Sequence, residues 1–250
     1  MATETTALSV EQAISARDHG YRVRLPIMRA SFATLARHVR GKRVLDYGCG
    51  IGLSAVVQVE SGAAHVTGVD LFEERIIEGR PFVASMGLSD RIRLEHAPDT
   101  RQLPFAGGAF EVVTCNAMLE HIPQPRDAWI REIWRMVAPG GMLIVNETPN
   151  KYLPWDFHTL GLPLTNWLPS PVAHWIGVKT GHWRAERTDW DYSGWRGMGY
   201  YEFVGNLDGD FTVEHEVTRT RHRVLRALGL PSGLLDPYPL YVVRKDHVPV

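Results

Sequence analysis

The sequence predicts an α/β fold built on a doubly wound, mostly parallel sheet of seven strands that ends in an antiparallel strand pair. Short apolar runs typical of buried strands alternate with helical segments between residues 43 and 147. A glycine-rich turn follows the first of these strands, as in α/β sheets that bind a ligand at that point. Strands that alternate with helices form right-handed crossovers, which leave the strands parallel and cover both faces of the sheet.

The first 41 residues are predicted to form a helical cover. Ser9 and Gln12 fit a capping box for a short helix that ends near residue 18. Apolar residues then recur at helical spacing up to Gly41. They are Leu25, Met28, Phe32, Leu35 and Val39.

Residues 42–148 are predicted to form the core of the domain. The expected strands are 43–47, 65–70, 92–97, 110–116 and 142–147. The expected helices are 53–61, 73–86 and 127–138. Each helix is followed by a breaker, which is Gly62, Gly87 or the sequence PGG.

The regular alternation stops after residue 148. Residues 149–197 are rich in Pro, Gly and Trp, and six of the eight tryptophans of the chain lie there. Because so long a connection is uncommon inside a compact domain, we expect residues 149–205 to form a cap over the site. Its aromatic rings could stack on a substrate or simply pack the cap. Residues 206–250 complete the single domain with strands at 210–218 and 238–245.

The composition, with 44% hydrophobic and 22% charged residues, is that of an ordinary globular protein. The 250 residues carry a formal net charge of −1, which gives no basic stripe for a nucleic acid. No apolar run is long enough to span a membrane, the N-terminus lacks a signal-peptide pattern, and two cysteines cannot form a disulfide framework. We therefore expect a cytoplasmic protein with a small-molecule substrate, without a nucleic-acid partner and without stable membrane insertion. The oligomeric state stays open, a homodimer included.

The stretch VLDYGCGIG, residues 44–52, indicates where a ligand binds. Ligands of open α/β sheets bind beyond the carboxyl ends of the strands. Gly48 and Gly50 fit a dinucleotide fingerprint, but its third glycine comes one residue early, at Gly52. A phosphate-binding loop is also excluded, since no Gly-Lys-Ser/Thr follows.

Three acidic residues narrow the choice of ligand. Asp46, near the end of the first strand, suits a cationic group better than a pyrophosphate. Asp70 ends the second strand, where a carboxylate can accept both hydroxyls of a ribose. Asp99 follows the third strand and can accept an adenine amino group. A nucleoside with a cationic tail and no phosphate describes S-adenosylmethionine.

Four segments resemble, in order and spacing, the motifs of the class I S-adenosylmethionine-dependent methyltransferases of small molecules. They are VLDYGCGIG, VTGVDL, APDTRQLPFAGGAFEVVTCNAMLEHI and RMVAPGGMLIV, within residues 40–147. The resemblance implies a Rossmann-like sheet, S-adenosylmethionine as the cofactor and methyl transfer as the reaction. Glu111 stands where the family usually has Asp, a departure that we expect to be neutral.

The resemblance also implies roles at the methionine end of the cofactor. The three glycines would let the backbone approach the methionine moiety, with Cys49 as a small residue that fits the turn. Asp46 would lie near the ammonium, and Asn116 would offer it a carbonyl. Tyr21 or an arginine of the N-terminal segment would reach the methionine carboxylate or an anionic substrate, with a solvated helix face as the alternative for most of these arginines. Those arginines are Arg17, Arg22, Arg24 and Arg29.

At the adenosine end, the resemblance implies four further contacts. Asp70 would hold the ribose, and Leu71 would pack on the adenine. Asp99 would accept the adenine amino group, while the backbone of Thr100 would meet a ring nitrogen.

Histidines are the candidates for a catalytic base, which a hydroxyl acceptor needs and an amine or activated carbon does not. His158 is the first candidate, because Asp156 beside it could orient the ring. His182 is the second. His121 is the third, since packing or a helix start also explains it.

A metal site is not predicted. Metal-dependent members of the family resemble E-x-x-E-H at residues 117–121, but Ala117 replaces the first glutamate here. Glu120 and His121 remain, and two adjacent ligands with a distant histidine are a poor metal pattern.

The predicted function is transfer of a methyl group from S-adenosylmethionine to a small molecule. The acceptor is expected to be a hydroxyl of a natural product or a glycan-type molecule. The alternatives are a C- or N-methyltransferase and a fold relative that binds the cofactor without turnover.

Overall fold

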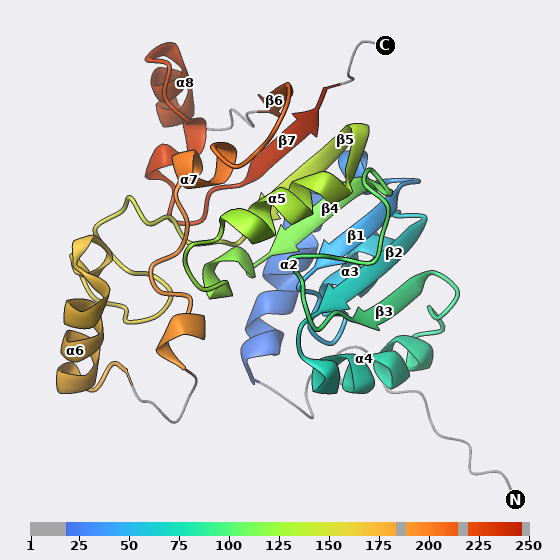
Figure 1. The fold of residues 1–250 in the computed structure, drawn as a ribbon, viewed down its shortest axis with the longest axis horizontal. Coiled ribbons are helices and arrows are strands. Elements are labelled where there is room, and N and C mark those ends of the chain that lie inside the picture. Colours follow the sequence, from blue (N-terminus) through green and yellow to red (C-terminus); the bar gives the residue numbers. More distant parts are fainter. Residues whose placement is uncertain (1–18, 184–188, 215–219, 247–250) are drawn as a thin grey trace, which may run out of the picture.

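A seven-stranded sheet forms the centre of the computed structural model, which describes residues 19–183, 189–214 and 220–246. The strand order is β3-β2-β1-β4-β5-β7-β6 (Figure 1). Strands β1 to β5 pair in parallel, and β7 pairs antiparallel with both β5 and β6. The predicted fold class is therefore confirmed, including the antiparallel pair at the end.

Most strands lie where the sequence predicts them. Their bounds are β1 Arg43–Tyr47, β2 His65–Asp70, β3 Ile92–His96, β4 Phe110–Asn116, β5 Val137–Asn146, β6 Phe211–Glu214 and β7 Tyr241–Lys245. The start of β5 was predicted wrongly. The preceding helix ends at Met136, and β5 begins at Val137, where it pairs with Phe110 before a shift in register. Pro139 has no N–H to continue a helix, so this segment joins the sheet early.

Helices and 3₁₀ turns connect the strands. The helices are α2 His19–Val39, α3 Leu53–Glu60, α4 Glu73–Ser85, α5 Asp127–Met136, α6 Ser170–Thr180, α7 Tyr200–Val204 and α8 Thr220–Ala227. The 3₁₀ turns are η1 Leu119–His121, η2 Thr165–Trp167, η3 Trp190–Tyr192 and η4 Ser232–Leu235. The helix expected from Ser9 lies outside the described residues, and α7 and α8 were not predicted. None of the described helices combines the length and apolar character needed to cross a bilayer.

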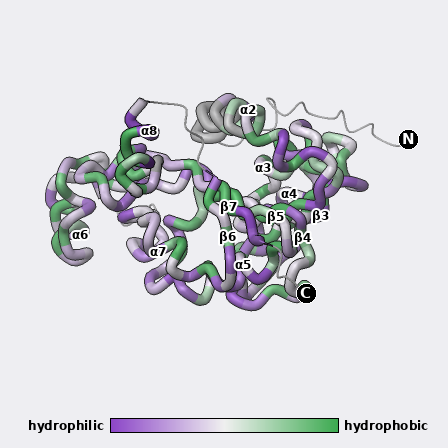
Figure 2. Tube along the Cα trace, turned by 90° about the horizontal axis from the view of Figure 1, so that it is seen from above, coloured by the Kyte–Doolittle hydropathy of each residue, from purple (hydrophilic) through white to green (hydrophobic). Residues whose placement is uncertain are grey.

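Both faces of the sheet are covered by apolar side chains. Val44 belongs to the cluster packed under α2 and α3, whereas its neighbour Leu45 belongs to the cluster on the opposite face, with Ile133 of α5. This alternation is the period of two expected for a strand that is buried on both faces. Figure 2 shows the strands between α2 on one side and α5 on the other. The candidate functional site lies at the carboxyl ends of β1, β2 and β4.

The described residues of the cap have a small hydrophobic core of their own. Trp183 is buried there with Leu160 and Ala173, and Trp190 and Trp195 pack against them. The packing alternative is therefore correct for these three tryptophans. The other three cap tryptophans are exposed: Trp155 by 44%, Trp167 by 59% and Trp175 by 59%. The cap and α6 lie at the end of the molecule opposite β3 (Figure 1).

The edge strand β3 is covered at its middle by an arginine of α4. The Nε and Nη2 atoms of Arg80 donate to the backbone carbonyl of Leu94 over 3.2 and 3.1 Å. Since β3 is the last strand on its side of the sheet, this carbonyl would otherwise be open to another chain.

Helix α4 lies unusually close to the glycine-rich turn because of Gly79. A Cβ at Gly79 would lie 2.6 Å from the backbone oxygen of Ile51 and 2.7 Å from Leu94 Cδ1. The absence of a side chain at Gly79 therefore lets α4 pack directly against the backbone of the turn.

Replacing Gly79 by alanine should destabilise the protein by about 1–3 kcal/mol, although alanine favours helices, because the added methyl meets backbone. Urea unfolding measures the change. Gly107→Ala is the matched control, since its Cβ would have no neighbour closer than 3.6 Å; it should shift stability by no more than about 0.5 kcal/mol. Equal stabilities of the two variants would show that α4 can move away.

Candidate functional site

The glycine-rich turn after β1 is shaped by left-handed backbone at three positions. Gly48, Gly50 and Gly52 have φ of 77°, 55° and 87°, a region that disfavours other residues. A Cβ at Gly48 would lie 2.1 Å from Met118 Cγ, whereas one at Gly50 would meet nothing within 4 Å. The backbone at Gly50 is thus open to a ligand.

The buried side chain of Asp46 connects the elements around the turn through hydrogen bonds. Its side chain accepts hydrogen bonds from the hydroxyls of Ser54 and Thr114 and from Asn116 Nδ2, and the residue is 1% exposed. Burial raises the pKa of Asp46, while these donors lower it in part. The carboxylate is therefore engaged by the protein itself, and its effect on a bound ammonium would pass through Asn116.

Asn116 fits the ammonium better than Asp46 does. Its Nδ2 is used by Asp46, but its buried Oδ1 accepts no hydrogen bond from the described residues. A buried acceptor without a donor is costly unless a ligand supplies one. The amide oxygen therefore suits a cationic ligand at the end of β4.

Asp70 links the turn to the end of β2. Its Oδ2 accepts from the backbone N–H of Gly50 over 2.8 Å, and its Oδ1 from that of Phe72 over 2.9 Å. Each carboxylate oxygen keeps a further lone pair, so both can also accept a ribose hydroxyl. Leu71 is 38% exposed beside it and offers an apolar surface for a base.

Asp99 and Thr100 follow β3 on the same side of the sheet. Arg101 donates to both carboxylate oxygens of Asp99 over 2.9 and 3.0 Å and lowers the pKa of Asp99, so this group stays an acceptor. The carbonyl of Thr100 accepts from the Tyr47 hydroxyl over 2.5 Å, and its hydroxyl accepts from Trp129 Nε1. The position of Thr100 is thereby fixed.

Cys49 points into the protein. Its thiol is buried against Gly68, whose missing side chain makes room for it, and burial raises the pKa of Cys49 well above its usual value. The residue is thus a space-filling part of the turn. The side chains of Tyr21 and of three N-terminal arginines, Arg17, Arg22 and Arg24, lie outside the described part of the chain. Arg29 pairs with Glu60 over 3.3 Å.

Glu120, His121 and His158 form a cluster beside the turn. One ligand atom from each residue lies within 4.8 Å of the others, and the two histidine ring centroids are 5.1 Å apart. Met118, which packs on Gly48, directly precedes the η1 turn that carries Glu120 and His121. Two residues far apart in sequence, His121 and His158, are thus brought together next to the methionine end of the predicted cofactor site.

The hydrogen bonds of this cluster define a proton acceptor. His121 Nδ1 lies 2.8 Å from the backbone oxygen of Tyr192, so Nδ1 carries the proton and donates it. In the neutral ring, Nε2 then presents its lone pair, 3.9 Å from Glu120 Oε1. Glu120 is 1% exposed; its Oε2 accepts from the Thr148 hydroxyl, while Oε1 accepts no hydrogen bond from the described residues. A proton or cation at Nε2 would be stabilised by this carboxylate.

Asp156 does not orient the ring of His158 as predicted. Its carboxylate accepts from the backbone N–H groups of His158, Thr159 and Leu160 over 2.7 to 3.0 Å, and so shapes the loop. His158 instead packs against Gly194, whose lack of a side chain makes room for the ring. His182 is placed outside the cluster, and its Nδ1 donates to the Leu160 carbonyl over 2.8 Å.

Sequence reasoning missed two members of this site. Thr148 and Tyr192 contact the cluster through a hydroxyl and a backbone carbonyl. A hydroxyl directly after the fifth strand was a usable signal for Thr148. No sequence pattern identifies a backbone carbonyl of a distant loop as the partner of a histidine.

The cluster has the donor set of a divalent metal site. Two histidines and one carboxylate suit Zn²⁺ or Fe²⁺ with open positions for a substrate, and suit Mg²⁺ and Ca²⁺ less well. The unpartnered Glu120 Oε1 is compatible with such an ion. The expectation of no metal therefore stays a prediction to be tested.

Comparison with known proteins assigns the core. Residues 44–141 match a family described as a methyltransferase domain. The ubiquinone biosynthesis O-methyltransferase of Psychrobacter arcticus is 37% identical over 116 residues, which are 45% of this chain and 44% of that protein. The corresponding protein of Neisseria meningitidis is 37% identical over 122 residues, 46% of this chain and 49% of that protein. The chain thus spans about half the length of the curated relatives it matches.

Solved structures extend the likeness of the fold beyond that core. An S-adenosylmethionine-dependent methyltransferase from Mesorhizobium loti has a TM-score of 0.53 at 19% identity and covers 86% of this chain and 96% of its own. The [4+2]-cyclase SpnF has a TM-score of 0.56 at 20% identity and covers 88% of this chain and 82% of its own. The glycine-rich turn, Asp70 and Asp99 all fall within the matched residues. Residues 44–141 therefore match a methyltransferase domain, and the fold around them is shared with S-adenosylmethionine-dependent methyltransferases.

Proposed function

We propose that this protein transfers the methyl group of S-adenosylmethionine to a hydroxyl of a small molecule. The observation that carries the proposal is the cluster of Glu120, His121 and His158 beside the glycine-rich turn. A hydroxyl loses its proton as it attacks the methyl group, and histidine is the usual acceptor of that proton. The O-methyltransferase names of the curated relatives support a hydroxyl acceptor.

The cofactor site is supported by groups that lack a partner or a neighbour. When bound, S-adenosylmethionine supplies an activated methyl group on a sulfonium. Asn116 Oδ1 would accept from its ammonium, and the open backbone at Gly50 would approach its methionine moiety. Asp70 would accept from the ribose hydroxyls, and Leu71 and Asp99 would contact the adenine. Orientation and exclusion of water are the main contributions of the protein to such a transfer.

His121 is the proposed proton acceptor, with His158 beside it. The hydrogen bond to Tyr192 leaves Nε2 of His121 free to accept, and the buried Glu120 stabilises the imidazolium that results. The cap thus orients the ring of His121 through Tyr192, and the buried carboxylate of Glu120 stabilises the protonated ring.

The acceptor is proposed to be a natural product or glycan-type molecule that contacts the cap. The rings of Trp155 and Phe157 are stacked with centroids 6.3 Å apart, and they are exposed by 44% and 47%. Both residues lie within three positions before His158 in the sequence. Such rings can hold an apolar or sugar-like face. An amine or carbon acceptor would need no base, and binding without turnover would leave the cluster without a use.

A divalent ion in the cluster is the second candidate for activating the hydroxyl. Glu120 Oε1 and His121 Nε2 are two acceptors that face each other over 3.9 Å, and an ion held by them and His158 would lower the pKa of a bound hydroxyl.

Asp70→Ala should weaken binding of S-adenosylhomocysteine by at least about tenfold, because a good charge-assisted hydrogen bond contributes at least that much. Calorimetric titration measures the affinity, and Asp90→Ala, an exposed carboxylate on another loop, should leave it unchanged. A wild-type protein that does not bind S-adenosylhomocysteine would refute the cofactor assignment.

His121→Ala and His158→Ala should each slow methyl transfer by about 10²- to 10⁴-fold, as expected for loss of a general base. The measurement is formation of S-adenosylhomocysteine with an acceptor panel, and affinity for the cofactor should not change. His182→Ala is the matched control and should keep the wild-type rate, because His182 lies outside the cluster. If His182→Ala alone abolishes turnover, the base is elsewhere in the cap.

Removal of metal ions by a chelator should leave the rate of methyl transfer unchanged if His121 acts as the base. Elemental analysis of the purified protein should then show well below one transition-metal ion per chain. Loss of activity on chelation that Zn²⁺ or Mn²⁺ restores, and that His158→Ala abolishes together with metal binding, would replace the base by an ion.

A further inference from the structure

Arg126 is a buried cation that the proposed chemistry does not use. It lies at the start of α5, is 1% exposed, and is the largest fully buried side chain of the described residues. A guanidinium stays charged in a protein, so burying it costs free energy unless its N–H groups find acceptors. The partners of Arg126 therefore show what the charge is for.

On one side, Arg126 holds the η1 turn on both flanks of His121. Its Nε donates to the carbonyl of Ile122 over 2.9 Å, and its Nη2 donates to the carbonyl of Glu120 over 3.2 Å. These carbonyls belong to the residues directly before and after His121. The backbone position of the proposed base is thus set by one side chain.

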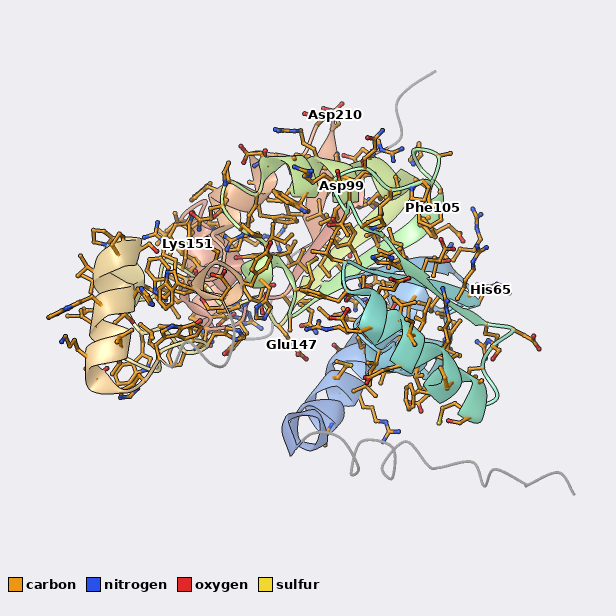
Figure 3. All side chains as sticks on the ribbon, turned by 60° about the horizontal axis from the view of Figure 1, so that its bottom comes forward. His65, Asp99, Phe105, Glu147, Lys151 and Asp210 are labelled. Carbon is orange, nitrogen blue, oxygen red and sulfur yellow. The ribbon has the colours of Figure 1, made fainter. Side chains whose placement is uncertain are left out.

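On the other side, Arg126 holds the end of the cap. Its Nη1 donates to the carbonyl of Gly197 over 2.8 Å and to Glu202 Oε1 over 3.1 Å. Glu202 Oε2 in turn pairs with Lys151, the third residue of the cap. Burial raises and these two cations lower the pKa of Glu202, with a net lowering, so the carboxylate stays charged. Lys151 lies on the side of the sheet that carries α6 (Figure 3).

Lys151, Glu202 and Arg126 thus form a series of paired charges. This series connects the first and last residues of the cap to the η1 turn. A second link runs in parallel, because His121 Nδ1 donates to Tyr192 of the cap. The position of His121 is therefore coupled to that of the cap by two separate sets of contacts. A lysine could not replace Arg126, since only the planar guanidinium reaches three chain segments at once.

We propose that Arg126 is a positioning residue that locks the cap and the proton acceptor into one geometry. This inference rests on the proposed function, in which His121 takes the proton. Arg126 touches neither cofactor nor acceptor in this assignment; it acts through Glu120, His121 and the cap. Displacement of a base by about 1 Å can cost about 10²-fold in rate.

Arg126→Lys is expected to lower kcat by about 10- to 100-fold while the affinity for S-adenosylhomocysteine stays at the wild-type value. Added guanidinium should restore part of kcat to Arg126→Gly, and ammonium at equal concentration should not. Arg135→Lys is the matched control: Arg135 also holds two backbone carbonyls and a carboxylate, those of Leu103, Phe105 and Glu132, but none in the cap. Its kcat should not change, whatever its stability.

Hydrogen exchange separates the failure of this inference from the failure of the proposed function, because it needs no acceptor. In Arg126→Lys, residues 119–122, 149–152 and 196–202 should exchange faster together, while the core strands stay protected. Unchanged exchange in these segments, or equal kcat losses in Arg126→Lys and Arg135→Lys, would overturn the positioning role. Coordinated exchange without any methyl transfer would keep the lock and refute the function.

Discussion

The buried carboxylate of Asp46 is the constraint on which the cofactor side of the structure depends. It lies where the strand order reverses between β1 and β4, and it takes donors from α3 and from β4. An unpaired carboxylate at that depth would be very costly. Strand β1, the helix after the turn and the end of β4 must therefore be in place together, which fixes Asn116 and the open backbone at Gly50 as well.

The sequence predicts the part of the fold that local pattern controls. Strands β1 to β4 and helices α3 and α4 lie within one or two residues of their predicted bounds, because apolar periodicity and glycine breakers act over short distances. The start of β5 required knowledge of its pairing with Phe110. Helix α8 is rich in arginine and lies between two predicted strands, so its place depends on tertiary packing that no local pattern carries.

The same division applies to the site. Asp70 and Gly50 are close in the fold and belong to recognisable motifs, so their pairing could be expected. The meeting of His121 with His158 depends on how the cap folds back, and the role of Asp156 depended on which backbone N–H groups faced it. The cap tryptophans show the limit most clearly: residue type alone does not separate Trp183, buried in the cap core, from Trp175, exposed on α6.

Arg80 gives the sheet a property that concerns its neighbours in solution. Two N–H groups occupy the Leu94 carbonyl at the outer edge of β3. A strand from another molecule would first have to displace a charged, forked donor and leave it without its acceptor. Arg80 therefore opposes strand addition at this edge. The formation of intermolecular sheets through β3 is thereby disfavoured at high protein concentration.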